Sequence, residues 1–166
     1  MKIKLTSVYV DDQSKALGFY TEVLGFAKKA DFSQGPFRWL TVGSPEEPDG
    51  TQLQLALNDK PAAKAYQQAI FQQGQPAAMF YTDDVKGDYE RIKARGAEFT
   101  MPPTDVTGST IAMLKDTCGM PSASDGGYVK SLMQRVVEPG KMAAWIAPPE
   151  RGVNNLPVDY EYVRLN

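Results

Sequence analysis

The order of apolar and polar positions predicts a strand, an acidic turn and a helix at the start of the chain. Lys2–Val10 is rich in β-branched and aromatic residues with a short alternation, which indicates a strand. Asp11-Asp12 ends it. After Ser14, apolar residues recur at helical spacing: Ala16, Leu17, Phe19, Tyr20, Val23 and Leu24. Gly25 suits the left-handed end of a helix, with Phe26 packing back behind it.

Two further strands and a short helix follow. Phe37–Gly43 and Thr51–Leu57 have strand-like patterns, and the loop between them contains two prolines and a glycine, as turns commonly do. Ala62–Gln73 is rich in alanine and glutamine, which predicts a short helix.

The opening pattern then recurs, which indicates an internal duplication. Ala77–Thr82 is a predicted strand, Asp83-Asp84 an acidic break and Val85–Ala94 a predicted helix that Gly96 closes. The acidic pairs lie 72 residues apart, and Gly25 and Gly96 lie 71 apart. We expect both acidic pairs to shape the turn and cap the following helix. Ser109–Leu114 is a predicted strand of the second copy.

The chain changes character after Gly119. Residues 120–127 (MPSASDGG) are polar and open with a proline, so they make a poor central strand where the repeat requires one. Tyr128–Val137 has apolar residues at helical spacing and predicts a helix. Lys141–Ala147 could form a short strand. Three alternatives follow: residues 120–127 distort into place, the tail is a divergent or frameshifted terminus that packs poorly, or Val158–Leu165 substitutes as a late strand. We favour the last, because an unpaired sheet edge is a liability.

Composition narrows the class of protein. Apolar residues make up 42% of the 166 residues, enough to bury the core of one domain or two half-domains. A net charge of −2 gives no electrostatic case for nucleic acid. No run of apolar residues is long enough for a transmembrane helix or a signal peptide, so we expect no membrane partner. A lone Cys118 fits a reducing cytoplasm.

Residues 8–26, VYVDDQSKALGFYTEVLGF, resemble the opening module of the vicinal oxygen chelate superfamily of glyoxalase, bleomycin-resistance and extradiol dioxygenase proteins. The second copy is similar in Tyr81–Asp84, Ile92, Gly96-Ala97 and Phe99, and 116–119 resemble the turn before the family's last strand. The resemblance implies an α+β fold of two βαβββ modules whose curled mixed sheets enclose a shared cavity, commonly in a homodimer. We expect modules at 1–60 and 77–119, a linker with a short helix at 61–76 and an atypical extension at 120–166, which could supply the last strand.

The resemblance also places four metal-ligand positions, usually histidine or glutamate, and this chain contains no histidine. They fall at Leu5, near Gln54, at about Ala77 and near Ala123. Leucine and alanine carry no donor atoms, and a neutral amide oxygen is a weak ligand. The other acids cluster in predicted turns, where solvated carboxylates are the ordinary interpretation. We expect no cofactor, although a divalent metal at a displaced carboxylate site stays open.

No catalytic residue emerges from the sequence. Triads and dyads that need histidine are impossible, and Cys118 has no histidine to activate it. Gly126-Gly127 lacks the motif of a phosphate loop.

Strand alternation predicts which side chains face the cavity if position 5 does. The candidate ligand-binding residues are Ser7, Tyr9, Trp39, Gln52, Gln54, Met79 and Tyr81, with Arg38 as the alternative to Trp39. Such a lining suits a neutral or aromatic small molecule. The alternative is that these residues fill a collapsed core.

Three functions stay open. The sequence favours a metal-free protein that sequesters a small molecule, as bleomycin-resistance proteins do, rather than an enzyme. The second possibility is a lyase, isomerase or dioxygenase with a displaced metal site. The third is a non-catalytic interaction module that uses the predicted helix Tyr128–Val137 as its interface.

Overall fold

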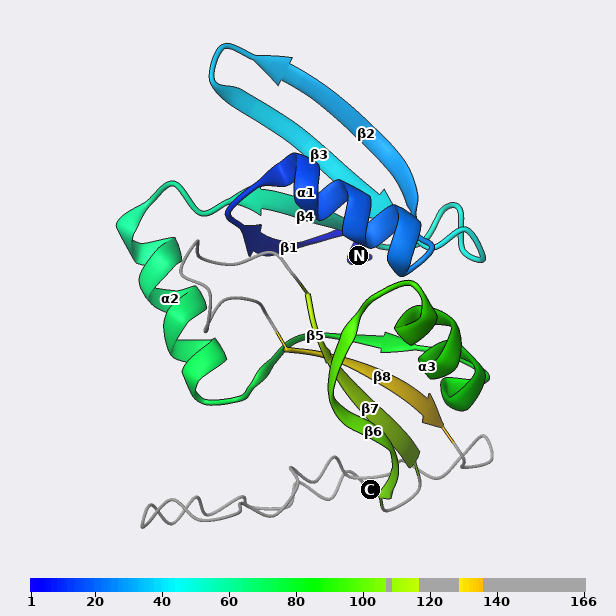
Figure 1. Ribbon diagram of the computed structural model, residues 1–166. Helices are drawn as coiled ribbons and strands as arrows, with labels where there is room; N and C mark the ends of the chain where they lie inside the picture. Colours follow the sequence, from blue (N-terminus) through cyan, green and yellow to red (C-terminus); the bar gives the residue numbers. More distant parts are fainter. Residues whose placement is uncertain (107–108, 117–128, 136–166) are drawn as a thin grey trace.

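The computed structural model describes residues 1–106, 109–116 and 129–135, which form two four-stranded sheets with helices on one face (Figure 1). The first module consists of β1 (Leu5–Val10), α1 (Gln13–Gly18), η1 (Phe19–Val23), β2 (Ala27–Gln34), β3 (Phe37–Gly43) and β4 (Gln52–Leu57). The linker helix is α2 (Pro61–Gln72). The second module consists of β5 (Pro76–Tyr81), α3 (Val85–Ala94), β6 (Glu98–Val106), β7 (Ser109–Lys115) and β8 (Val129–Arg135).

The two sheets have the same topology, so the predicted duplication is confirmed for the described residues. The strand order is β1-β4-β3-β2 in one sheet and β5-β8-β7-β6 in the other. In each sheet the first and last strands of the module pair in parallel, and the other pairs are antiparallel. The mixed sheets curl without closing, which confirms the predicted α+β class (Figure 1).

The two acidic pairs act as predicted, because the second aspartate of each caps a helix. The Asp12 carboxylate accepts hydrogen bonds from the backbone N–H groups of Ser14 (2.8 Å) and Lys15 (2.9 Å). The Asp84 carboxylate accepts one from the N–H of Gly87 (2.9 Å). The helices are followed by Gly25 at φ 91° and Gly96 at φ 93°, a left-handed conformation that glycine adopts without steric cost.

One hydrophobic core joins the two modules. It contains buried side chains from α1, η1, β1, β3 and β4 of the first module and from α3 and β7 of the second. Phe26 and Phe80 meet across the junction, with ring centroids 5.1 Å apart in an edge-on arrangement. Both helix-covered sheet faces therefore contribute to the shared core.

Polar contacts fix the junction of the modules as well. The Tyr20 hydroxyl donates to a carboxylate oxygen of Asp116 at 3.0 Å, and both residues are fully buried. Arg95 of the second module donates to the carbonyl of Glu22 (3.0 Å), and Arg91 reaches the carbonyl of Leu24 (3.4 Å). Guanidinium groups at the carboxyl end of a helix satisfy free carbonyls and complement its dipole.

The prediction for the start of the tail is wrong. Val129–Arg135 forms β8 between β5 and β7, whereas the apolar spacing of Tyr128–Val137 predicted a helix. Two neighbouring strands offer unpaired backbone groups at that place, and pairing with both outweighs a weak helical pattern. The expected late strand Val158–Leu165 and the segment Lys141–Ala147 lie outside the described residues. No helix among the described residues has the length and apolar character to cross a membrane.

The junction yields a stability prediction. Tyr20→Phe removes one hydrogen bond from the fully buried Asp116 carboxylate, so we expect the free energy of unfolding to fall by about 1–3 kcal/mol. Tyr81→Phe, at a side chain that is 69% exposed, is the matched control and should change stability by less than about 0.5 kcal/mol. Urea unfolding measures both. Equal stability of the two variants would contradict the structural role of this contact.

Candidate ligand-binding site

The first sheet has one covered face and one open face. Val8 and Val10 of β1 and Leu53 and Leu55 of β4 are buried on the helix side. The alternate residues Ser7, Tyr9, Gln52 and Gln54 are half-buried or exposed, as strand alternation predicted. The open face is therefore where the candidate residues of this sheet lie.

Ser7, Gln54 and Thr41 form a polar row on this side of the sheet, because they are direct partners in the strand register, and Thr41 at its inner end is fully buried. The Ser7 hydroxyl donates to the side-chain oxygen of Gln54, and the Thr41 hydroxyl donates to that of Gln52, both at 2.8 Å. The amide nitrogens of the two glutamines make no hydrogen bond within the described part of the chain. They are available as donors to a ligand.

Aromatic side chains lie beside the polar row. Trp39 on β3 stacks on Phe32 of β2, with centroids 6.3 Å apart and planes inclined by 20°. Phe37 lies 6.4 Å from Trp39. Phe32 is 58% exposed and Phe37 is 53% exposed, so this aromatic group offers apolar ring surface to solvent. We refer to Phe32, Phe37 and Trp39 as the aromatic wall.

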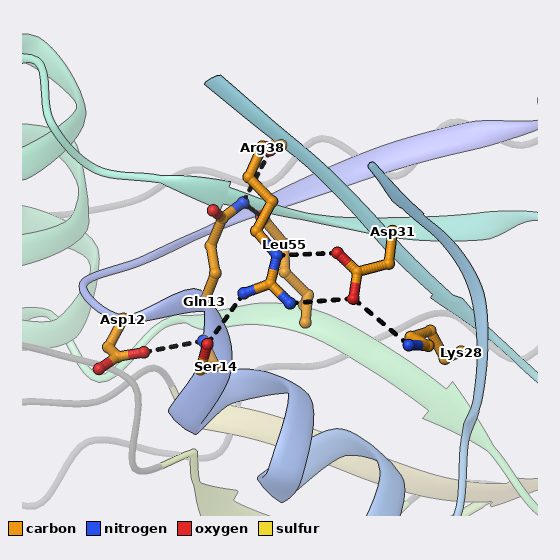
Figure 2. A network of polar contacts seen from close by, with 7 residues as sticks. All are labelled: Asp12, Gln13, Ser14, Lys28, Asp31, Arg38 and Leu55. Carbon is orange, nitrogen blue, oxygen red and sulfur yellow. Dashed lines mark hydrogen bonds and ion pairs between the residues drawn. The ribbon is translucent and has the colours of Figure 1, made fainter. Parts of the chain in front are cut away.

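Arg38, the alternative to Trp39, belongs to the helix side (Figure 2). Its guanidinium forms two hydrogen bonds with the Asp31 carboxylate, at 2.8 and 3.0 Å, and a third with the Ser14 hydroxyl at 2.9 Å. Lys28 adds a contact to Asp31 at 3.3 Å. The hydrogen bonds from Arg38 and then Lys28 lower the pKa of Asp31 to about 2.

Gln13 connects this network to the centre of the sheet. Its side-chain nitrogen donates to the carbonyls of Arg38 (3.0 Å) and Leu55 (2.7 Å), which belong to β3 and β4 (Figure 2). The backbone pairing of β3 with β4 covers only Thr41–Gln54 and Val42–Leu53. The side chain of Gln13 therefore connects β3 and β4 beyond the last backbone pair of the two strands. It holds β3 at Arg38, the residue before Trp39.

A cavity of about 430 Å³ lies at the β1 edge of the first sheet, away from the aromatic wall. Its lining is Ser7, Val8, Tyr9, Ala62, Ala63, Tyr66 and Ala77. The rings of Tyr9 and Tyr66 meet edge-on, with centroids 6.4 Å apart. Thus β1, the linker helix α2 and the start of β5 share one cavity, which contains two of the predicted site residues.

The predicted residues of the second sheet lie apart from this cavity. Met79 is half-buried on β5, and Tyr81 is 69% exposed. Tyr81 lines a separate cavity of about 310 Å³ beside Thr82, Asp88 and Arg91. A single copy of the chain thus gathers Ser7, Tyr9, Trp39, Gln52 and Gln54 on one sheet face, without bringing Met79 and Tyr81 to them.

Sequence reasoning missed several residues of this face. Thr41 could have been found by continuing the alternation of β3 from Trp39. Phe32 had no such signal, because β2 is mostly exposed and polar. Helical spacing predicts that Tyr66 faces inward, but α2 buries Ala63 and Gln67 instead and leaves Tyr66 53% exposed beside the cavity. Their positions depend on tertiary contacts that a single sequence does not reveal.

The positions that the resemblance assigns to a metal do not suit one. Leu5 and Ala77 have no donor atoms, and the side-chain oxygen of Gln54 already accepts a hydrogen bond from Ser7. The fourth position, near Ala123, lies outside the described residues; in β8 Ser131 is opposite Met79, as Gln54 is opposite Ser7 in the first sheet. No cluster of three acidic, cysteine or histidine side chains suited to a metal occurs within the described ranges.

Comparisons with known proteins agree with this architecture. The sequence model of the Glyoxalase/Bleomycin resistance protein/Dioxygenase superfamily matches residues 2–121, so the chain belongs to this superfamily. It is 52% identical over 119 residues to the uncharacterized protein YurT of Bacillus subtilis (strain 168), which covers 72% of this chain and 94% of YurT. The crystal structure of TnmS3, an antibiotic binding protein from Streptomyces sp. CB03234, is 30% identical with a TM-score of 0.61, covering 81% of this chain and 96% of TnmS3.

A short similarity of a different kind also exists. Benzoyl-CoA oxygenase component B of Aromatoleum evansii is 62% identical to this chain over 47 residues. The match covers 28% of this chain and only 10% of the oxygenase component. It therefore relates a segment of this chain to a small part of a much longer protein.

The Asp31 network yields a pH prediction. A carboxyl whose pKa falls from 3.8 to about 2 on folding stabilises the protein above its unfolded pKa, and this stabilisation disappears as the pH falls toward 2. We expect Asp31→Asn to lower the melting temperature at pH 7 and to leave a shallower decrease between about pH 4 and about pH 2. Asp59→Asn, which removes a surface partner of Lys60, controls for the lost charge. If the melting temperatures of wild type and Asp31→Asn fell equally steeply between about pH 4 and about pH 2, the proposed role of the network would be contradicted.

Proposed function

We propose that this protein binds a neutral, aromatic small molecule on the open face of the first sheet, without a metal. The observation that carries the proposal is the aromatic wall beside two free glutamine amide groups. The antibiotic-binding description of TnmS3, a structural relative, supports a binding role for this scaffold.

The chemistry of the face favours an uncharged ligand. The Trp39 and Phe32 rings provide apolar surface for stacking, worth about 0.5–1.5 kcal/mol per aromatic pair beyond area burial. The Arg38 guanidinium, the charge nearest in sequence, points to Asp31 on the helix side. Lys29 crosses the face at Gly43, at the far end of β3 from Phe37, and its ammonium donates to the Pro48 carbonyl at 3.1 Å. A charged ligand beside the aromatic wall would therefore lose its hydration without a charged partner among the candidate residues.

Three tricyclic probes test the proposal by calorimetry: neutral 9-anthracenemethanol, anionic anthracene-9-carboxylate and cationic 9-aminoacridine. We expect the neutral probe to bind most tightly. Trp39→Ala should weaken the affinity for this probe by about tenfold, or ~1.4 kcal/mol. Gln54→Ala should weaken it by about threefold to tenfold, because one amide donor is lost. Binding in excess EDTA should be unchanged.

Tyr81→Phe on the second sheet is the control variant and should bind like wild type. If Trp39→Ala left the affinity for the neutral probe unchanged, the proposed position of the ligand on this face would be contradicted. Affinity that requires manganese, nickel, zinc or iron would favour the alternative of a lyase, isomerase or dioxygenase with a displaced metal site.

We also propose a homodimer in which a second copy closes over the open face and encloses the ligand between the two copies. A single copy leaves Leu5 (39%), Phe32 (58%) and Phe37 (53%) exposed together with the sheet face, an apolar surface that association would bury. Phe37→Asp should convert the dimer into a monomer, because an unpaired carboxylate in an apolar interface is costly. Sedimentation velocity measures this change. A wild-type monomer at micromolar concentration would contradict the proposed dimer.

The interaction module that relied on a helix at Tyr128–Val137 loses its basis, because Val129–Arg135 is a strand within a sheet. We propose instead modules at 1–60 and 77–119 joined by the linker 61–76, with residues 120–166 as an extension that supplies β8, the last strand of the second sheet. A cytoplasmic location also belongs to this proposal and rests on the lone Cys118.

A further inference from the structure

The cavity beneath α2 has a lining that combines small apolar side chains with hydroxyl groups. Ala62 and Ala63 of α2 and Ala77 of β5 leave room between the linker helix and β1. Ser7, Tyr9 and Tyr66 supply hydroxyls. A volume of about 430 Å³ lies within the range of small-molecule sites.

The hydroxyls of Tyr9 and Tyr66 make no hydrogen bond within the described part of the chain. Each can donate one hydrogen bond and accept others. The Ser7 hydroxyl donates to Gln54, so its oxygen still has capacity to accept. No charged side chain belongs to the lining that the structure describes, so a charged group would be desolvated there without a partner.

Buried contacts hold this wall in place. Gln67 of α2 is 4% exposed, accepts a hydrogen bond from the Asn58 side chain at 2.6 Å, and donates to the Tyr9 carbonyl at 3.4 Å. Ala63 is also buried, at 7% exposure. These contacts fix the register of α2 against β1, and they hold Tyr66 opposite Tyr9 before any ligand arrives.

We propose that this cavity is a second subsite, which takes an uncharged ring beside the edge-on pair of Tyr9 and Tyr66, with a hydroxyl or carbonyl oxygen of the ring directed at their hydroxyls. The inference rests on the proposed function, because the same ligand would continue across the open face to the aromatic wall. β1 and β3 are separated by β4, so Tyr9 and Trp39 lie at least about two strand spacings, or ~10 Å, apart. Ala56 of β4 is opposite Tyr9 in the register, and its small side chain leaves room for a ligand between Tyr9 and Trp39.

The test fills the subsite without disturbing the helix. Ala62→Leu places a larger side chain in the cavity, whereas Ala65→Leu adds the same side chain on an exposed position of α2 outside the lining. We expect Ala62→Leu to weaken the affinity for 9-anthracenemethanol by about tenfold and Ala65→Leu to leave this affinity unchanged. Tyr66→Phe should weaken the same probe by about threefold to tenfold. Anthracene, which lacks the oxygen, should not distinguish Tyr66→Phe from wild type.

The outcomes separate this subsite from the proposed function. Weakening by both Ala62→Leu and Trp39→Ala, with Ala65→Leu unchanged and melting temperatures preserved, supports the subsite. Weakening by Trp39→Ala alone overturns the subsite and leaves the proposed function standing. Failure of wild-type protein to bind any of the probes overturns the proposed function.

Discussion

The buried contact between Tyr20 and Asp116 determines how the two modules combine. Both residues are fully buried, and they come from the helix of one module and the end of β7 in the other. Removing this hydrogen bond takes a partner from a fully buried carboxylate, which is costly. The modules are thereby joined through their helix-covered faces, and the opposite face of the first sheet stays open. Tyr20 and Asp116, which belong to the two segments that resemble the family, thus have a structural role at the junction of the modules.

The open face differs in chemistry from the rest of the surface because charges are held elsewhere. Arg38 bonds to Asp31 on the helix side, and Arg91 and Arg95 bond to carbonyls at the junction. Hydroxyl, amide and aromatic groups make up the candidate site on the open face, and Lys29 at its edge donates to the Pro48 carbonyl. Such groups bind by stacking and by single hydrogen bonds, so selectivity would come from shape and oxygen placement. The proposed ligand surface is built on the scaffold of the Glyoxalase/Bleomycin resistance protein/Dioxygenase superfamily.

Sequence reasoning predicted the elements with strong local signals. Phe37–Gly43 and Val85–Ala94 have the bounds that the structure gives them, because alternation and helical spacing were clear and turn residues marked the ends. It did not single out β2, whose residues are mostly exposed, or β6, which contains two prolines. β8 was taken for a helix, since sheet pairing overrode its local pattern. Ser7, Tyr9, Gln52 and Gln54 followed from alternation alone, whereas Tyr66 depends on how α2 docks.

The most direct measurement of the central claim is an amide and indole proton–nitrogen NMR spectrum recorded with 9-anthracenemethanol in excess EDTA. The account predicts that the largest shift changes fall on the Trp39 indole and the backbone amides of Ser7, Tyr9 and Gln54. Changes confined to the cavity beside Asp88 and Arg91, or changes that appear only after a metal is added, would contradict it.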